Sequence, residues 1–525
     1  MFQLDIIREK LDSNQSMQPL SIGVQTFRKM IEGNFLYVDK TRNIYELVKH
    51  SAGAYFLSRP RRFGKSLLIS TLEEIFLGNK ELFRGLWIYE AEFPWKKHPV
   101  LRFDFSKQKA KTPETMIEFI ENELNDIAKK FSLKLEKKQY YEKFQELITR
   151  LASKEKVVIL IDEYDKAIID HIDNTPLAVE MREVMKGFFT VLKGNDEHIR
   201  FLFLTGVSKF SRAGVFSNLN HLNDITLDNA YSSLLGITRS ELEYFFSIYL
   251  QDFSKCENTS LEKLLEKIQY WYNGYRFSRK GEKVYNPFST LLLLNKKEFQ
   301  HHWFETGTPE FLIKLILQKD YDIIKIPIQV SELSFSSYEV DDLSLTPLLV
   351  QTGYLTIKDY DEERMLYTLD YPNFEVKNAF LAYIVKKLHR KEFSESILYS
   401  IIDALNEDNL DECISLLREI FFSINYDIQI PLEKYYQTIF YLIFTLLGFR
   451  IQTEVKTNRG RIDAVIESKS IYIFEFKLNG TKEEAILQIR NNKYYEKYLN
   501  KGKDIFLIGA EFKDRNIGEY LLETA

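Results

Sequence analysis

Residues 58–66 are Ser-Arg-Pro-Arg-Arg-Phe-Gly-Lys-Ser, and they stand between an apolar run, AYFL at 54–57, and the segment LLISTLEEIF at 67–76. The apolar run predicts a strand and the later segment predicts a helix. A turn from strand to helix points backbone N–H groups and the positive helix end at an anion. The stretch therefore predicts a phosphate-binding loop, in which Lys65 reaches the β- and γ-phosphates and Ser66 completes a Mg²⁺ shell.

The start of this loop departs from the usual pattern. That pattern has a glycine five residues before Gly64, where this chain has Arg59, and Pro60 removes one backbone N–H. A helix start that contains Gly-Lys-Ser by chance is the alternative interpretation, and the two following arginines are compatible with either phosphate contact or solvent. The candidate nucleotide-binding residues of the loop are Arg61, Arg62, Phe63, Gly64, Lys65 and Ser66.

A pair of acids follows a second apolar run about one hundred residues later. In VVILIDEYDK, at 157–166, Asp162 and Glu163 come at the end of a predicted buried strand. The carboxyl end of a central strand is where α/β sheets place ligand chemistry. We expect Asp162 to hold Mg²⁺ through water and Glu163 to orient or deprotonate the attacking water. A strand that ends in solvated acids is the alternative.

A third apolar run ends in polar residues. In FLFLTGVSKFSR, at 201–212, Thr205, Ser208 and Lys209 follow the predicted strand. We expect them beside the phosphate site, with Thr205 and Ser208 in contact with the nucleotide as a polar sensor of the γ-phosphate. An ordinary strand-to-loop transition is equally compatible with the sequence.

Strand and helix patterns alternate through the first part of the chain, which predicts an α/β domain with a mostly parallel, buried sheet. We assign residues 1–229 to this P-loop ATPase domain and residues 230–392 to a mainly helical middle region. An aromatic cluster in the middle region is compatible with base stacking, but packing is the favoured interpretation. Its members are Trp271, Tyr272, Tyr275 and Phe277. The predicted strands are 54–57, 100–105, 157–161 and 201–204, and the predicted helices between them are 114–131 and 138–151.

Residues 393–525 predict a second, smaller α/β domain. Strands are expected at 450–454, 463–467, 471–476 and 504–508, with a helix at 482–499 before the last of them. Glu475 and Lys477 alternate on one strand and so face the same side, and a hairpin brings Asp463 beside Glu475. Two carboxylates and a lysine form a hard-oxygen site for Mg²⁺ or Mn²⁺. The metal would be bound by Asp463 and Glu475, while Lys477 steadies the attacking water or the transition-state charge.

In its motifs the chain resembles the prokaryotic AAA-ATPase-like proteins that carry a C-terminal PD-(D/E)XK nuclease-superfamily domain, which has a restriction-endonuclease-like fold. The resemblance implies an ATP-binding module of the AAA or STAND-like kind. The loop LSRPRRFGKSLL, which lacks the usual first glycine, resembles the family's own version of this loop. The resemblance runs from about residue 19 to residue 498. Its motifs are PLSIGVQTFRKMIEGNFLYVDKT, LSRPRRFGKSLL, LIDEYDKAI, LTGVSKFS, WYNGYRFS, VYNPFSTL, LVQTGYLTI and YPNFEV.

The resemblance also bears on the C-terminal site. Asp463, Glu475 and Lys477 match the nuclease core residue by residue, and Gln488 and Tyr494 resemble additional positions of that superfamily, although a solvated helix face explains them equally well. Glu433, on a predicted helix at 432–447, is a candidate for an extra acidic ligand.

The composition limits partners and location. The chain has 525 residues, 45% hydrophobic and 28% charged, and its net charge of −5 gives no overall basic footprint, so any DNA contact must be local. Cys256 and Cys413 are far apart, which disfavours a disulfide framework and a cysteine-type zinc site. The start lacks signal-peptide features and the longest apolar stretch, 439–449, is too short to span a membrane. We therefore expect a cytoplasmic protein without a membrane partner.

Three functional hypotheses follow. The leading one is an ATP-binding and ATP-hydrolysing protein that regulates a Mg²⁺-dependent or Mn²⁺-dependent nuclease acting on DNA. The second is a STAND-like nucleotide switch or signalling protein whose C-terminal domain only binds. The third, an interaction scaffold with two vestigial sites, requires both lysine–acid constellations to survive by accident. An arginine finger supplied in trans would require a homo-oligomer, and no arginine in the sequence clearly has that role.

Overall fold

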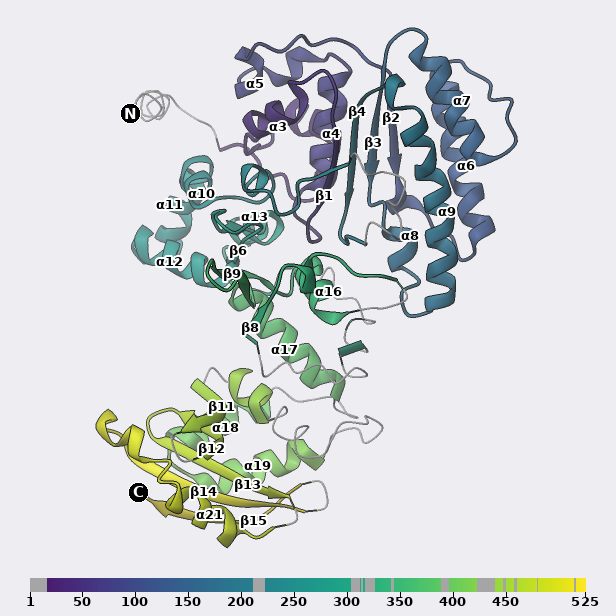
Figure 1. Cartoon of the computed structure of the whole chain (residues 1–525). Coiled ribbons are helices and arrows are strands. Elements are labelled where there is room, and N and C mark those ends of the chain that lie inside the picture. The colour runs from purple at the N-terminus through teal and green to yellow at the C-terminus, as the bar shows by residue number, and fades with distance from the viewer. Residues whose placement is uncertain are drawn as a thin grey trace. The chain divides into compact units, whose positions relative to one another are not determined.

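The computed structural model of the chain divides into two compact units. Unit 1 comprises Met1–Phe311 and Pro327–Val376, and unit 2 comprises Leu312–Ile326 and Lys377–Ala525 (Figure 1). The structure describes residues 17–210, 222–303, 312, 315–316, 326–340, 344–388, 396–422, 440–446, 450–457, 460–478, 480–513 and 516–525.

Unit 1 is built on a five-stranded sheet. Its strand order is β2-β3-β4-β1-β5, and all neighbouring strands are parallel. Every residue of β3 is buried, which is why its sequence is apolar until it ends at Asp162. The expected parallel, buried sheet is confirmed. The strands are β1 (Ala54–Ser58), β2 (Val100–Asp104), β3 (Val157–Asp162), β4 (Ile199–Gly206) and β5 (Asn223–Asp224).

Helices cover both faces of this sheet (Figure 1). Successive residues of β2 face opposite sides: Phe103 packs on Phe144 and Phe188, whereas Arg102 pairs with Glu73 of α4 at 2.7 Å. The face under α4 is thus separate from the face under α7 and α9. The helices that flank the sheet are α4 (Lys65–Phe76), α6 (Pro113–Lys130), α7 (Tyr140–Ala152) and α9 (Thr175–Gly194).

The remainder of unit 1 is mostly helical, with two small antiparallel sheets, β6-β7 and β8-β10-β9. Tyr272 and Tyr275 of the aromatic cluster are buried, and Trp271 packs on Phe374, as expected for side chains that form a core. Before the middle region lie α2 (Phe27–Glu32), α3 (Thr41–Val48), α5 (Trp87–Glu90) and α8 (Lys166–Ile169). The middle helices are α10 (Arg239–Phe245), α11 (Ser247–Cys256), α12 (Leu261–Tyr272), α13 (Pro287–Lys296), α15 (Leu333–Ser336) and α16 (Leu345–Thr352). The small sheets comprise β6 (Asn273–Tyr275), β7 (Val284–Tyr285), β8 (Ile328–Val330), β9 (Thr356–Asp361) and β10 (Leu366–Asp370).

Unit 2 contains a five-stranded mixed sheet of order β11-β12-β13-β14-β15. Only β13 and β14 are parallel among these neighbours, and α21 connects them, as a parallel crossover requires. Ile473 packs against Ile486 and Ile489 of α21, whereas Phe474 packs on Phe440 on the other face. The elements are β11 (Arg450–Thr457), β12 (Gly460–Glu467), β13 (Ile471–Leu478), α21 (Lys482–Asn491), β14 (Ile505–Lys513) and β15 (Asn516–Thr524), preceded by α18 (Ser396–Asn406) and α19 (Leu410–Phe422). The helix α17 (Phe374–Leu388) begins in unit 1 and continues into unit 2.

Two details of unit 2 differ from the expectation. The single helix expected at 482–499 ends at Asn491, because Lys493 has a φ of 50° that a right-handed helix excludes, and a 3-10 segment, Glu496–Lys501, follows. The strand β15, which the sequence did not indicate, pairs with β14 at the sheet edge. In the described part of the chain, no helix is both long and apolar enough to cross a bilayer.

Candidate functional site

The loop between β1 and α4 contains two residues with positive φ. Gly64 has a φ of +93° and forms the N-cap of α4, a backbone conformation that favours glycine. Arg62 also has a positive φ, of 66°. Backbone strain of this kind at a non-glycine residue is concentrated at functional sites.

The Lys65 side chain lies across the inside of the loop. Its Nζ donates hydrogen bonds to the carbonyl oxygens of Arg59 and Pro60, both at 2.9 Å. Burial lowers the pKa of Lys65, and the charges of Glu163 and Asp162 act in the opposite direction. The Lys65 ammonium is thus held by two carbonyl oxygens of its own loop.

The two acids that end β3 occupy different surroundings. Asp162 is buried, and burial raises the pKa of its carboxyl, while a hydrogen bond with Ser66 lowers it. Among the described residues, Asp162 Oδ1 is buried and has no hydrogen-bond partner. Glu163, with a φ of 51°, turns out of the strand and lines the cavity described below.

Thr205 near the end of β4 and Ser208 just after it are buried, Lys209 is half-buried, and none of the three lines the cavity. Thr205 lies next to Leu57 of β1 in the sheet register, and the Ser208 hydroxyl accepts a hydrogen bond from Tyr338 at 2.8 Å. Lys209 pairs with Asp224 at 2.6 Å. In this structure, Ser208 and Lys209 are therefore engaged by the protein itself.

Asp165, in the same motif as the two acids, holds the ends of β3 and β4 together. Its Oδ2 accepts hydrogen bonds from the backbone N–H groups of Val207, at 2.9 Å, and Ser208. Burial raises the pKa of Asp165 to about 6, and the hydrogen bond from Ser208 counters this shift. The carboxyl ends of the two strands are thus fixed relative to each other.

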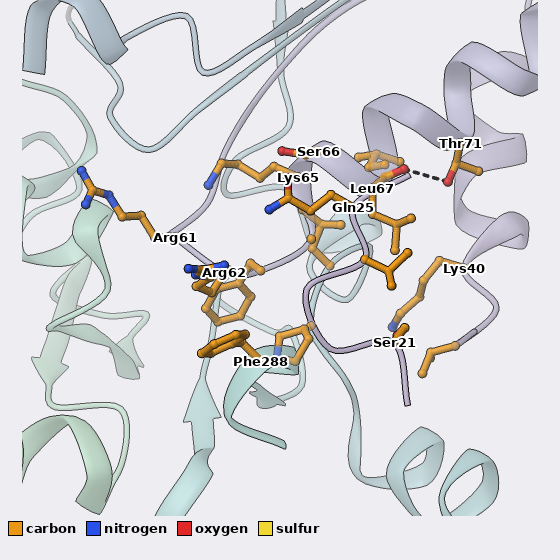
Figure 2. A pocket seen from close by; sticks show the side chains of 18 of the residues that line it. Ser21, Gln25, Lys40, Arg61, Arg62, Lys65, Ser66, Leu67, Thr71 and Phe288 are labelled. Carbon is orange, nitrogen blue, oxygen red and sulfur yellow. Dashed lines mark hydrogen bonds between the residues drawn. The ribbon is translucent and has the colours of Figure 1, made fainter. Parts of the chain in front are cut away.

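A cavity of about 630 Å³ lies against the loop (Figure 2). This volume is in the range of cavities that hold cofactors. Lys65, Ser66 and Gln25 all line the cavity, and in Figure 2 the Arg61 side chain extends away from them. At one side the Arg62 guanidinium stacks on the Phe288 ring, 4.6 Å from its centre. The cavity is lined by all six predicted loop residues, from Arg61 to Ser66, and by Glu163.

The other end of the cavity is largely apolar and has a partly buried ion pair at its wall. Lys40 lines it and pairs with Glu241 at 2.6 Å, while its Nζ also donates to the carbonyl of Ser233. Burial lowers the pKa of Lys40, and Glu241 raises it. An apolar chamber that adjoins a phosphate-binding loop suits a nucleoside. Its apolar walls include Val24, Leu36, Val38, Leu67, Ile237, Phe246 and Leu291.

In unit 2, the predicted carboxylates and lysine come together on one face of the sheet. Asp463 Oδ2 accepts a hydrogen bond from the backbone N–H of Phe476 at 2.8 Å, and Lys477 Nζ lies 3.2 Å from Glu475 Oε1. Ala464 pairs with Phe474 in the antiparallel register, which places Asp463 opposite Glu475. Phe474 and Phe476 face the other side, as the alternation predicts.

Glu475 has the features of a metal ligand. Burial and the nearby charge of Asp463 raise the pKa of Glu475 to about 7, and Lys477 counters that shift. Its Oε2 is buried and has no hydrogen-bond partner among the residues that the structure describes. A buried carboxylate oxygen without a donor, next to a second carboxylate, suits a hard divalent cation such as Mg²⁺ or Mn²⁺.

A chain of polar contacts continues from the lysine. Lys477 Nζ donates to Gln488 Oε1 at 2.5 Å, and Gln488 Nε2 lies 3.4 Å from the Tyr494 hydroxyl, which also accepts from Asn492 at 2.9 Å. Gln488 and Tyr494 therefore belong to the same network as the lysine. Glu433 lies outside the described residues. Within the described residues, no group of three or more His, Cys, Asp or Glu side chains is arranged to hold a metal ion. Among those residues, the carboxylates of this site are therefore Asp463 and Glu475 alone.

Comparisons with known proteins agree with the fold of the two α/β parts. A family described as "Predicted AAA-ATPase" matches residues 21–216, and the PD-(D/E)XK nuclease superfamily matches residues 432–518. The chain is 36% identical over 527 residues to an uncharacterized protein in the vnfD 5′ region of Azotobacter chroococcum mcd 1, a match that covers 97% of this chain and 99% of that protein. The chain belongs to the AAA-ATPase-like proteins with a PD-(D/E)XK nuclease-superfamily domain.

In this AAA-ATPase-like protein, sequence reasoning missed several residues that shape the cavity. Lys40 and Phe288 belong to motifs that were recognised, VDKT and VYNPFST, but neither motif has a spacing that assigns a role to them. Asp165 follows the acid pair by two residues, and nothing in that spacing indicates that its carboxylate joins the ends of β3 and β4. Their positions depend on contacts between segments far apart in sequence.

Proposed function

We propose that this chain binds and hydrolyses ATP in unit 1 and cleaves nucleic-acid phosphodiester bonds in unit 2, with the nucleotide controlling cleavage. The observation that carries the nuclease part is the pairing of Asp463 and Glu475 beside Lys477, with one buried Glu475 oxygen left without a donor among the described residues. Superfamily membership alone would also be compatible with a binding module, whereas this arrangement has the charge and donors that phosphodiester chemistry needs.

For the ATPase part, Lys65 would exchange its loop carbonyls for the β- and γ-phosphates, and the loop N–H groups would bind the same oxygens. The Ser66 hydroxyl and the Asp162 carboxylate would hold Mg²⁺. Glu163, which projects from the end of β3 into the cavity, would orient the attacking water and accept its proton. The nucleoside would occupy the apolar end of the cavity.

For the nuclease part, Asp463 and Glu475 would hold Mg²⁺ or Mn²⁺, which supplies Lewis-acid polarisation of the phosphodiester when bound. The Lys477 ammonium would stabilise negative charge that develops on the phosphate oxygens. Gln488, which accepts a hydrogen bond from Lys477, would orient that ammonium. We propose DNA as the substrate.

A nucleotide switch with a C-terminal domain that only binds is the second candidate. It is favoured by the charge of the nuclease domain, because residues 451–525 carry 13 basic and 12 acidic side chains and so offer little overall attraction for DNA. In that case ATP would control conformation or assembly, and phosphodiester cleavage would be absent.

The test uses the purified full chain with linear, circular and single-stranded DNA, with Mg²⁺ or Mn²⁺, and with or without ATP. Lys477→Ala is the blank against contaminating nucleases. Lys469→Ala is the matched control, because this lysine is exposed and lies at the turn between β12 and β13, at the far end from Asp463.

Cleavage that is lost in Lys477→Ala, kept in Lys469→Ala and altered by ATP supports the regulated nuclease. Cleavage that persists in Lys477→Ala contradicts it. If neither metal gives cleavage while ATP is still bound and hydrolysed, the nucleotide switch becomes the better account. ATP hydrolysis in Lys477→Ala should remain at the wild-type rate, since the residue lies in the other unit.

A further inference from the structure

Two consecutive residues of the phosphate-binding loop are held from the middle region of unit 1. The Trp303 indole Nε1 donates a hydrogen bond to the Arg61 carbonyl at 3.2 Å. The Phe288 ring lies under the Arg62 guanidinium at 4.6 Å. The first contact fixes a backbone oxygen, and the second fixes the side chain of a residue with positive φ.

Both contacts lead back to one buried carboxylate. Glu375 Oε1 accepts the backbone N–H of Trp303 at 2.7 Å, and Glu375 Oε2 accepts the hydroxyl of Ser289, the neighbour of Phe288, at 2.9 Å. Glu375 is 1% exposed and does not line the cavity. Each carboxylate oxygen therefore anchors one of the two segments that hold the loop.

Neighbouring packing supports the same arrangement. Trp303 packs on the Tyr354 ring at 5.3 Å, and a Cβ added to the adjacent Gly353 would come within 2.8 Å of Pro60 in the loop. Gly353 also has a φ of +91°, which favours glycine. A larger residue would therefore be disfavoured both by the backbone conformation and by the contact with Pro60. The middle region is thus in contact with the loop at three successive residues, from Pro60 to Arg62.

We propose that Glu375 is a positioning residue for the phosphate-binding loop, acting through Trp303 and Ser289 to fix the loop in its binding shape; this rests on the proposed function that unit 1 binds a nucleotide. A charged acceptor that takes two buried hydrogen bonds holds both segments more tightly than neutral contacts would. Because loop N–H groups bind phosphate in the ground state and in the transition state alike, misplacing the loop weakens uniform binding. Glu375 is the second residue of α17, and the boundary between the two units falls just after Val376. Glu375 therefore lies close in sequence to the residue at which unit 2 resumes.

The test compares Glu375→Ala, Glu375→Gln, Trp303→Phe and Ser289→Ala in the full chain, with thermal unfolding measured for each. We expect Glu375→Ala to raise the KM for ATP about tenfold, the usual effect of losing a charged hydrogen bond, with a smaller change in kcat. Glu375→Gln, which keeps an acceptor for the Trp303 N–H, should restore most of the affinity. Trp303→Phe removes the indole N–H that binds the Arg61 carbonyl, and Ser289→Ala removes the hydroxyl that binds Glu375. Each variant should raise the KM for ATP by less than Glu375→Ala does.

A second measurement separates this inference from the proposed function. Hydrogen exchange in nucleotide-free protein should be faster in the loop, residues 59–64, in Glu375→Ala and in Trp303→Phe than in the wild type. If the wild type binds no ATP, the proposed function fails, and loop exchange still decides the role of Glu375. The proposal would be overturned if Trp303→Phe and Ser289→Ala both have the same loop exchange rate and the same KM for ATP as the wild type. This outcome decides the question even if Glu375→Ala does not fold. A Gln variant as impaired as the Ala variant would overturn the proposal too.

Discussion

Asp463 on β12 and Phe476 on β13 are joined by a hydrogen bond of 2.8 Å from the Phe476 backbone N–H to Asp463 Oδ2. Phe476 separates Glu475 from Lys477, so this bond places the Asp463 carboxylate next to both side chains. The backbone donor is fixed by the pairing of β13 with β14. The carboxylate is therefore positioned by the sheet before any ligand binds, and preorganisation of this kind reduces the cost of binding a metal.

Asp463→Asn tests whether this carboxylate binds a metal. Its amide oxygen can still accept from Phe476, so we expect the fold to be kept and the affinity for Mn²⁺ to fall at least about tenfold, as one of two charged ligands is lost. Calorimetric titration with Mn²⁺ measures this change. The matched control is Glu519→Gln, which neutralises an exposed carboxylate that pairs with Lys482. Equal Mn²⁺ affinity in both variants would contradict a metal site at Asp463.

The raised pKa of Glu475 predicts a pH-dependent stability. Its value of about 7 in the folded protein, against 4.5 in the unfolded chain, means that stability is fully present below about pH 4.5 and falls as the pH rises to 7. Glu475→Gln removes the buried charge, so we expect it to raise the free energy of unfolding of unit 2 by on the order of 2 kcal/mol at pH 8 and to change it little at pH 4.5.

Chemical denaturation of the wild type and Glu475→Gln at the two pH values measures the difference. Mn²⁺ should raise the stability of the wild type at pH 8 and leave the variant unchanged, since the variant lacks the ionised ligand. A variant that is less stable than the wild type at pH 8 without metal would show that the carboxylate is not disfavoured there.

Lys65→Ala should abolish tight nucleotide binding. When ATP binds, the ammonium would exchange its hydrogen bonds to two loop carbonyls for hydrogen bonds to two phosphates. Alanine cannot form them, so we expect the ATP affinity to fall about a hundredfold, the effect of two charge-assisted hydrogen bonds. Titration with a fluorescent ATP analogue measures the affinity. Lys129→Ala, on the exposed face of α6, is the control and should bind as the wild type does. Unchanged affinity in Lys65→Ala would place the nucleotide elsewhere.

Much of this architecture could be predicted because its signals are local. The buried strand that ends at Asp162 and the alternation of Glu475 with Lys477 are periodic patterns within a few residues, and the structure has both. The strand β15 has mostly half-exposed and exposed positions at a sheet edge, so its sequence lacks a strong alternation of apolar residues. Local pattern alone therefore left it out.

The contacts around the phosphate-binding loop had no local signal. Trp303 and Arg61 are 242 positions apart, and Glu375 and Ser289 are 86 apart, so no period or spacing relates them. Their motifs were recognised as blocks of a family, which shows that they matter without showing what they touch. The role of a residue such as Arg59, which replaces the usual first glycine, became clear only from its partners.

Arg59→Gly would restore the usual first glycine of the loop, and we expect it to destabilise unit 1. The buried guanidinium donates to the carbonyls of Ser58 and Thr226 at 2.9 and 2.8 Å and to Tyr231 at 3.2 Å, and it stacks on Phe277 at 4.1 Å. Glycine would leave these carbonyls without their donor and open a cavity, a loss of about 2 kcal/mol in the free energy of unfolding once the desolvation of the charge is offset. Chemical denaturation measures this loss. ATP affinity should fall with it, because a backbone that is no longer fixed by the guanidinium displaces the carbonyl of residue 59 that holds Lys65. Arg59→Lys keeps the charge but not the planar guanidinium. Its free energy of unfolding should therefore lie between those of the wild type and Arg59→Gly. A glycine variant as stable as the wild type would mean that the loop tolerates either residue and that the guanidinium contacts are incidental.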